Sequence, residues 1–457
     1  MTNRLDRDFH LPGLLRFALP TIIMMLVVSL YTIVDGVLIA RLVGENALAA
    51  ANVAYPAISF TLAMGIMLGT GGSAVVAHKM GAGYLEEARR DFGFLALVAV
   101  CIGLAVCLAG ALFAGPLARL LGASDLLLDD TVTYLRVQLC FAPMAMLQLL
   151  FESFFVTAGR PGLGLGLAVA AGVTNAVLDY LYMGPMQMGI LGAALGTVTG
   201  YSIPAVVGVL FFLLRRQGLR FGRPHGDLRM LGRACFNGAS EMVTNLSMAV
   251  TTFLFNAIMM AYLGEAGVSA ITIVLYAQFL LVALYMGFSM GVAPVFSFNR
   301  GAGRYDRMRR IFGYCLRFIL VSSVAILVVA LALSGVVVGI FSTPGSQVYA
   351  IALDGFRRFA PAFLFAGVNI FSSALFTALS DGRTSAIISF ARTFGFLLLG
   401  LLLLPRLLEV DGVWLAVPLA ELLSCLLSVW FLRRKRADFG FGGGDLPRHG
   451  GRGGGRT

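Results

Sequence analysis

Long apolar stretches with few charged residues recur along almost the whole of this 457-residue chain. Most are about 20 residues long or longer, the length that an α-helix needs to cross the hydrocarbon core of a bilayer. Apolar and polar residues do not alternate in them, so they are typical of helices and not of barrel strands. Because lipid offers a backbone no hydrogen-bond partners, only helices or closed barrels cross it. The sequence therefore predicts an all-α integral membrane protein.

The low charge content supports the same interpretation. Charged residues make up 12% of the chain and hydrophobic residues 59%. A soluble globular protein carries about 25% charged residues. A chain of this length with so little charge has too few polar side chains to cover a water-soluble core, which excludes a soluble domain.

The apolar pattern predicts about twelve transmembrane helices in two six-helix lobes. The spans are expected near residues 14–41, 47–76, 92–115, 132–158, 163–184, 189–214, 232–261, 267–297, 312–341, 350–379, 385–405 and 411–432. We assign residues 1–222 to an N-terminal lobe and residues 223–437 to a C-terminal lobe. Residues 438–457, rich in Gly and Arg, are expected to form a disordered cytoplasmic tail.

Basic residues gather in alternate loops between these spans. They lie at Arg89–Arg90, throughout 215–233, at several positions of 300–310, and at Arg433–Arg436. Loops rich in Lys and Arg stay in the cytoplasm during insertion. We therefore predict a multi-pass inner-membrane protein with both termini in the cytoplasm. The net charge of +11 is assigned to this orientation and not to binding of nucleic acid.

The two halves contain an internal repeat. The Gly-Ala-Gly motif at 81–83 recurs at 301–303, at an offset of 220 residues, and the Phe-Ala-Pro motif at 141–143 recurs at 359–361. An even number of helices in each repeat leaves both halves with the same orientation, related by an axis along the membrane normal. Such halves enclose a central site and give alternating access by rocking against each other.

The sequence offers nothing from which to build an ATP site or a catalytic metal centre. Its only lysines, Lys79 and Lys435, do not lie in a Gly-Lys-Ser/Thr context. The four histidines lie outside the predicted hydrocarbon region, at His10, His78, His225 and His449. We therefore expect no enzyme activity, no catalytic residues, no cofactor and no metal site beyond a possible Na⁺ site.

Carboxylates inside the predicted spans are the strongest functional signal, because a charge in hydrocarbon is costly and rarely kept without a role. Asp35, Asp179 and Thr197 are expected at one depth in the outer half of the N-terminal lobe. Asn175 lies four residues before Asp179, on the same helix face. Two adjacent carboxyls hold one proton firmly, and oxygen ligands of this kind also suit Na⁺. The alternative is a hydrogen-bonded polar cluster that only fixes helix packing.

The remaining polar residues of the spans are harder to assign. Tyr31, Glu152 and Glu241 are candidates for lining a substrate cavity, and for the two glutamates a structural hydrogen bond is an equal alternative. Glu421 is interpreted as structural. Arg392 is predicted to be buried, and it needs a carboxylate or carbonyl partner that the sequence does not name.

Several motifs resemble those of the multidrug and toxic compound extrusion (MATE) family, over nearly the whole chain up to Arg436. They are Tyr31–Gly36 with Gly44, the two Gly-Ala-Gly loops, Ala158–Pro161, Asn175–Asp179 and Gly412–Glu421. The resemblance is greatest to the prokaryotic DinF-like branch, and it implies a V-shaped fold and a location in the prokaryotic inner membrane. It also implies a cation-coupling site in the N-terminal lobe at Asp35, Asn175, Asp179 and Thr197. The NorM-like branch has acids deep in its seventh and tenth spans. Here the matching part of span seven is Leu246–Met248, and span ten has no acid past its outer mouth, which favours coupling through the N-terminal lobe.

Together these inferences predict a secondary active antiporter, functional as a monomer. It would export lipophilic, often cationic, small molecules in exchange for H⁺ or Na⁺ by alternating access. Cation binding at Asp35 and Asp179 would rearrange the first span, where Pro20 and Gly36 permit bending. The alternative is a flippase for lipid-linked precursors from the same superfamily. Such proteins often have a basic cavity, and this chain has little basic charge in its spans beyond Arg136, Arg317 and Arg392.

Overall fold

A computed structural model describes residues 4–439 of the chain, and in this part the regular elements are all helices. The first half contains η1 (Arg4–Asp6), α1 (Leu11–Leu42), α2 (Glu45–Gly81), α3 (Leu85–Leu120), α4 (Leu128–Cys140), α5 (Ala142–Thr157), α6 (Pro161–Met183) and α7 (Gly189–Leu214). The second half contains α8 (Leu228–Gly301), α9 (Tyr305–Ala332), α10 (Ser334–Phe341), α11 (Gln347–Phe359), α12 (Ala362–Ala378), α13 (Gly382–Phe390), the π-helix η2 (Ala391–Leu397) and α14 (Leu398–Arg434). The predicted tail lies almost entirely outside the described residues.

The number of spans agrees with the prediction. Eight helical stretches are long and apolar enough to cross a membrane, and two bent pairs, α4 with α5 and α11 with α12, add two more. Two of the eight stretches turn back on themselves, α8 at Gly264 and the stretch from α13 to α14 at Glu409, so each supplies two spans. The described residues therefore contain twelve spans, and the all-α membrane fold is confirmed.

The turn inside α8 follows from helix geometry. A straight helix of its 74 residues would be about 110 Å long, several times the thickness of a bilayer core. At Gly264 the backbone adopts φ 61°, a left-handed conformation that glycine takes without a steric penalty. The predicted spans 232–261 and 267–297 lie on either side of this residue.

The two bent pairs support the predicted repeat. Each pair bends by 55° at its break. The breaks fall at the two Phe-Ala-Pro motifs, where Pro143 stands in the first turn of α5 and Pro361 caps the start of α12. A proline has no amide hydrogen for the preceding helical turn and interrupts the helix there. The same local sequence thus produces the same bend in each half.

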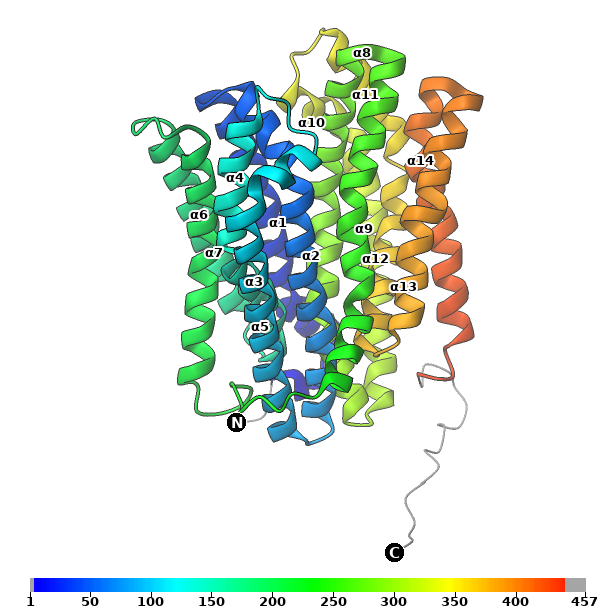
Figure 1. The fold of residues 1–457 in the computed structure, drawn as a ribbon. Helices are drawn as coiled ribbons and strands as arrows, with labels where there is room; N and C mark the ends of the chain where they lie inside the picture. Colours follow the sequence, from blue (N-terminus) through cyan, green and yellow to red (C-terminus); the bar gives the residue numbers. More distant parts are fainter. Residues whose placement is uncertain (1–3, 440–457) are drawn as a thin grey trace, which may run out of the picture.

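The basic loops lie together at one end of the bundle. The connections α2–α3, α7–α8 and α8–α9 and the end of α14 are all on the side where the described chain begins (Figure 1). We call this side the basic end and the opposite side the far end. The grouping agrees with the prediction from the loops, and the assignment of the basic end to the cytoplasm stays a prediction.

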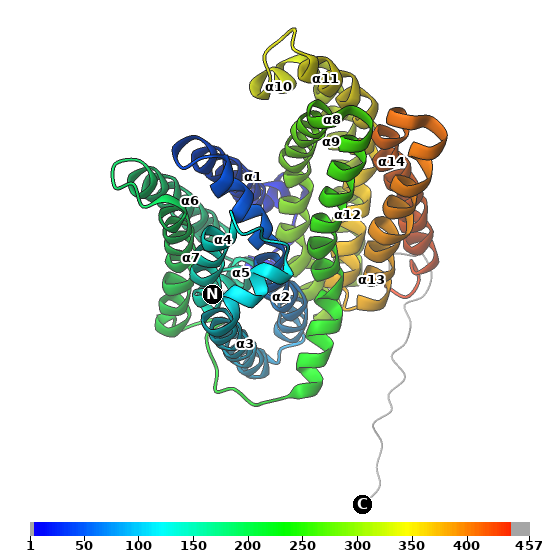
Figure 2. The same ribbon diagram turned by 45° about the horizontal axis from the view of Figure 1, so that its top comes forward.

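The two halves of the chain form two lobes, with α1–α7 on one side and α8–α14 on the other (Figure 2). Buried apolar residues form three clusters. The largest joins both halves and contains Phe92 of α3 and Phe288 of α8. The second contains only buried residues between Ile39 and Ala194, and the third only buried residues between Phe255 and Val417. The lobes thus share one core toward the basic end and have separate cores toward the far end. The predicted boundary at residue 222 stays a prediction.

Glycines bring the lobes into backbone contact near the basic end. A Cβ atom added at Gly81 would lie 1.9 Å from the carbonyl oxygen of Phe298, and one at Gly301 would lie 1.9 Å from that of His78. Residues 81 and 301, and residues 78 and 298, are each separated by the repeat offset of 220. Small residues allow such close approach between transmembrane helices. The lobes therefore meet through a pair of equivalent contacts.

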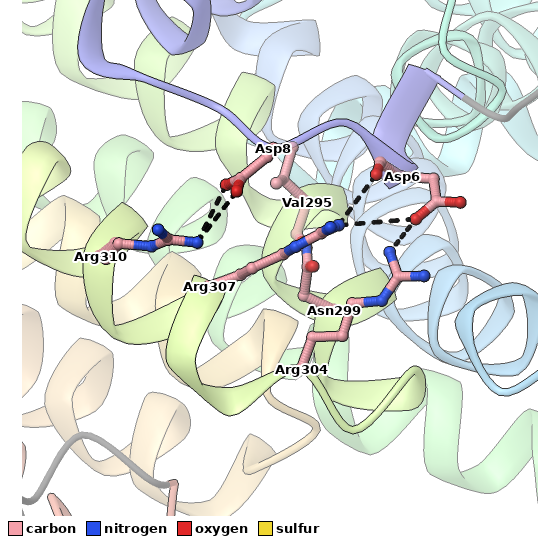
Figure 3. Close-up of polar contacts among 7 residues, drawn as sticks. All are labelled: Asp6, Asp8, Val295, Asn299, Arg304, Arg307 and Arg310. Carbon is pink, nitrogen blue, oxygen red and sulfur yellow. Dashed lines mark hydrogen bonds and ion pairs between the residues drawn. The ribbon is translucent and has the colours of Figure 1, made fainter.

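An N-terminal strap, residues 4–10, also ties the two lobes together before α1 begins. Asp6 forms an ion pair with Arg304, and its backbone carbonyl accepts a hydrogen bond of 3.0 Å from Nη1 of Arg307 (Figure 3). Asp8 pairs with Arg310, with 3.0 Å between Oδ2 and Nη2. The strap belongs to the first half of the chain, while its arginine partners lie at the start of α9. It therefore adds a polar bridge to the shared core at the basic end.

Candidate functional site

Asp179 and Asn175 lie on α6 and face α7. Both side chains are buried, and Nδ2 of Asn175 donates a hydrogen bond of 2.9 Å to Oδ2 of Asp179. The spacing of four residues predicts this contact. The close approach of α7 depends on Gly196, because a Cβ atom there would lie 1.9 Å from Oδ1 of Asp179. A bare backbone on α7 thus covers the carboxyl group of Asp179.

Asp35 on α1 completes the centre of the site. Its carboxyl group is within hydrogen-bonding reach of the Asp179 carboxyl group, and Oδ1 of each residue is buried without a donor from the described residues. We call these two residues the carboxyl pair. An ionised carboxylate only accepts hydrogen bonds. Two ionised carboxyl groups so close together would repel each other strongly in a low-dielectric setting. They therefore need a shared proton, or a cation between them.

Thr197 follows Gly196 on α7, but its hydroxyl group is used within its own helix. Oγ1 of Thr197 donates a hydrogen bond of 3.0 Å to the carbonyl oxygen of Ala193. Three of the four predicted coupling residues, Asp35, Asn175 and Asp179, are thus joined by side-chain contacts. Thr197 lies beside them in sequence without a described contact to the pair, and its part in coupling stays a prediction.

A polar cluster lies next to the carboxyl pair and includes two of the predicted cavity residues. Tyr31 on α1 contacts Gln148 on α5, and it lies close to Glu152, Asp35 and Tyr201. Nε2 of Gln148 donates a hydrogen bond of 3.1 Å to Oε1 of Glu152. Tyr31 and Glu152 are therefore neighbours of the carboxyl pair.

Sequence reasoning missed four members of this surrounding shell. They are Tyr134 and Gln138 on α4, Gln148 on α5 and Tyr201 on α7. Amide and phenol groups inside a predicted span must find polar partners. They therefore also indicate a possible functional site, although less strongly than the carboxylates do. The spacing of four residues between Gln148 and Glu152 was a usable signal as well.

The C-terminal lobe contains a buried acid in a different setting. Glu421 on α14 receives a hydrogen bond of 2.9 Å from Nε of Arg392, and its Oε2 receives one of 2.7 Å from Nδ2 of Asn369. Oγ of Ser428 in turn donates to Oδ1 of Asn369 at 3.1 Å. This network identifies the partner of Arg392, and it supports the structural interpretation of Glu421.

Glu241 does not share the surroundings of Glu152. It lies on the first span of α8, in the opposite lobe, and the charged group that acts on it is Arg392. Arg392 itself lies in η2, the π-helical segment between α13 and α14. Such segments occur mostly as single widened turns inside α-helices and are frequent at functional sites. Of the three predicted cavity residues, Tyr31 and Glu152 therefore lie together, and Glu241 lies apart from them.

The chain also matches a known protein family in both halves. The family model described as MatE matches residues 20–181 and 242–402. The chain belongs to the MatE family. As a MATE-family efflux transporter it is a transport protein and not an enzyme, as the sequence predicted, and the stretch matched in each half agrees with the two-lobed repeat.

Relatives with assigned names cover nearly the whole chain. The multidrug export protein MepA of Staphylococcus saprophyticus is 24% identical over 439 residues, which cover 92% of this chain and 94% of the relative. The protein of the same name in Staphylococcus haemolyticus is 23% identical over 428 residues, which cover 92% of each chain. This MATE transporter is therefore similar in length and organisation to those export proteins.

Solved structures show the same fold. A MATE crystal structure in complex with MaL6 gives a TM-score of 0.88 at 19% identity, covering 93% of this chain and 96% of that one. An outward-facing conformation of a multidrug resistance MATE family transporter of the MOP superfamily gives 0.87 at 18% identity, with the same coverage. A MOP superfamily transporter from Pyrococcus furiosus gives 0.86 at 19% identity, again with that coverage. At these identities the similarity establishes the two-lobed fold.

Proposed function

We propose that this MATE transporter exports lipophilic, often cationic, small molecules in exchange for H⁺ or Na⁺, and that the carboxyl pair carries the coupling cation. The observation that carries the proposal is the close approach of two acids, each with a buried carboxyl oxygen. Asp35 and Asp179 form no ion pair with any residue in the range 4–439, and each keeps one buried oxygen without a donor. A proton or a Na⁺ ion satisfies both groups at once.

Coupling follows from where the two acids sit. Asp179 belongs to the packed pair α6–α7, while Asp35 belongs to α1, which also packs against α8 of the other lobe. Loss of the proton or cation makes the two carboxylates repel one another. The repulsion acts between α1 and α6, and α1 contains Pro20 as a site for bending. The occupancy of the pair is thereby linked to the position of α1, and through α1 to the contact between the lobes.

The substrate class follows from the groups beside the pair. Tyr31, Tyr201 and Glu152 supply aromatic faces and a carboxyl group to a region of the N-terminal lobe that contains no arginine or lysine among their described contacts. Aromatic faces and acids attract organic cations. The MepA relatives are named as multidrug export proteins, which agrees with a broad substrate range.

The flippase alternative is less well supported. A carrier of polyprenyl phosphates needs free positive charge in its membrane cavity, because phosphate recognition relies on guanidinium and ammonium groups. Arg392 is the arginine predicted to be buried in the spans, and Glu421 neutralises it. The acids beside α1 would repel a phosphate. We therefore favour an exporter of neutral and cationic compounds.

The test is dye efflux from proteoliposomes under an imposed pH gradient or an imposed Na⁺ gradient. The wild type should expel a cationic dye under at least one of these gradients, and the effective gradient identifies the coupling ion. Asp35→Asn should reduce gradient-driven efflux to the level of empty liposomes. Asp125→Asn, which changes an exposed acid at the far end, is the matched control and should transport normally. Undiminished transport by both Asp35→Asn and Asp179→Asn would refute the role of the pair.

A further inference from the structure

A pocket of about 980 Å³ lies at the basic end, between the lobes and well away from the carboxyl pair. The last turn of α2 contributes His78 and Lys79 to its wall. The first turns of α8 contribute Arg229 and Arg233, and the first turn of α13 contributes Arg383. Because α2 belongs to the first half of the chain and the other segments to the second, the pocket bridges the two lobes. We call it the basic-end pocket.

Four arginines of this pocket form no ion pair within residues 4–439. Lys79 is neutralised by Asp91 at 2.6 Å, and Asp381, the single acid of the lining, is neutralised by Lys435. The arginines that line the pocket and form no ion pair within the described residues 4–439 are Arg229, Arg233, Arg300 and Arg383. Four unpaired guanidinium groups around one hollow repel one another, and an anion bound among them relieves this repulsion.

A buried donor indicates the same kind of ligand. Nη1 of Arg300 is buried and has no acceptor among the described residues, although a buried N–H group without an acceptor is unfavourable. An oxyanion with several acceptor oxygens, such as a phosphate group, matches this free donor and the guanidinium groups around it.

The size and the apolar wall of the pocket favour a phosphate that belongs to a lipid. A pocket of this volume accommodates an organic molecule and is far larger than an inorganic phosphate ion needs. Phe236 lines the same pocket and is 57% exposed, so it offers an apolar surface beside the arginines. Basic pockets between transmembrane helices bind anionic headgroups, while acyl chains follow the apolar surface.

We infer that the basic-end pocket binds the phosphate headgroup of an anionic phospholipid. The headgroup contacts α2 from one lobe and α8 and Arg383 from the other, so it binds best when the lobes are joined at the basic end. By mass action the bound lipid stabilises this state of the transporter against the state in which the basic end opens. The site is separate from the proposed coupling site and does not depend on the identity of the exported compound.

The test uses the purified full chain in a neutral detergent and three soluble probes. Dioctanoyl-phosphatidylglycerol, dioctanoyl-phosphatidylcholine and inorganic phosphate are titrated separately by calorimetry. We expect saturable binding of the phosphatidylglycerol probe and much weaker binding of the other two. The double variant Arg233→Gln/Arg383→Gln should raise its dissociation constant at least about tenfold, since each basic group near an anionic lipid contributes about one kcal/mol.

The matched control is Arg90→Gln/Arg220→Gln, which removes the same charge from exposed positions at the same end of the molecule. It should leave the dissociation constant unchanged. Equal weakening in both double variants would show a general surface attraction and overturn the site. Tight binding of inorganic phosphate alone would replace the lipid with a soluble phosphate compound. Equal affinity for both lipid probes, or no binding by the wild type, would also overturn the inference.

A second readout tests the link to lobe closure. Backbone amide exchange in residues 75–81 at the end of α2 should slow when phosphatidylglycerol is added to the wild type. It should not change when the lipid is added to the Arg233→Gln/Arg383→Gln variant. Protection that is equal in both proteins would contradict a headgroup that bridges the lobes.

Discussion

The two lobes bury their acids in opposite ways. In the N-terminal lobe Asp35 faces Asp179, a second acid, with the amide of Asn175 as the donor to the pair. In the C-terminal lobe Glu421 faces Arg392, and Asn369 supplies a further donor. Both arrangements stand in the same membrane and meet the same cost of burying charge. Glu421 meets that cost with a cation from its own lobe, whereas the carboxyl pair forms no ion pair among residues 4–439.

The difference separates a structural network from the proposed coupling site. A carboxylate paired with arginine is already neutralised, so a mobile cation gains little by binding there. A carboxyl pair without an internal cation depends on one that arrives from solution. Under the proposed function, this contrast accounts for coupling through the N-terminal lobe alone. The predictions below test the contrast from the largest expected effect to the smallest.

Neutralising the carboxyl pair should have the largest effect on function. Asp179→Asn keeps an acceptor for Asn175 and removes the possibility of carboxylate repulsion, so the variant should fold normally and lose gradient-driven efflux down to background. Glu421→Gln should keep coupled efflux in the fraction of protein that folds. Proteoliposome transport, normalised to folded protein by size-exclusion chromatography, measures both. Coupling lost in Glu421→Gln and kept in Asp179→Asn would reverse the assignment of the lobes.

Breaking the arginine pair should have the largest effect on stability. Arg392→Met leaves Glu421 buried without its cation, and removing one partner of a buried ion pair typically costs about 3–5 kcal/mol. Arg392→Met/Glu421→Gln removes both charges and should recover much of this loss. Denaturant unfolding in detergent, followed by helical circular dichroism, gives the free energies. A double variant as unstable as the single variant would show that Arg392 acts through packing.

A smaller effect is expected from crowding the carboxyl pair without removing it. Gly196→Ala places a Cβ atom against Oδ1 of Asp179, which pushes the carboxyl group away from Asp35. Overpacking of this kind typically costs about 1–3 kcal/mol, so the gradient needed for half-maximal efflux should rise about tenfold or more. Gly166→Ala meets no atom within 4 Å and is the control. Normal coupling in Gly196→Ala would mean that the contact between the acids is not needed.

The smallest effect is expected at the N-terminal strap, where ion pairs are partly exposed. Asp8→Asn removes the pair with Arg310, whose two side chains are about half exposed, and exposed pairs typically contribute about 0.2–1 kcal/mol. The free energy of unfolding should therefore fall much less in Asp8→Asn than in Arg392→Met. This small decrease should vanish in high salt. A loss as large as that of Arg392→Met would show that burial does not explain the contrast between ion pairs.

The course of the spans could be predicted from the sequence because it depends on length and local chemistry. Apolar length predicted twelve spans, and the break at Gly264 lies between two of them. The contact of Asn175 with Asp179 followed from their spacing of four residues on one helix. The shared level of Asp35 and Asp179 followed from the rise per residue of a helix. Each of these inferences needs only the positions of residues along one helix.

The partners across helices could not be predicted in this way. Arg392 and Glu421 are 29 residues apart on different spans, and helices that are apolar on every side give no sign of which face meets which neighbour. Glu241 and Glu152 were both predicted to line a substrate cavity, but only the fold shows that Arg392 is the charged group that acts on Glu241. Rotation of each helix about its axis is decided by packing.

By itself, the sequence determined the all-helical membrane fold, the repeat and the identity of the acids in the spans. The tertiary structure alone decided that Asp35 meets another acid while Glu421 meets an arginine, and that the lobes join at the basic end through Gly81 and Gly301. The physical reason is that lipid exposure acts on each helix separately and is readable along the chain. The pairing of charges and of small residues depends on which helices touch, and only the folded chain settles that.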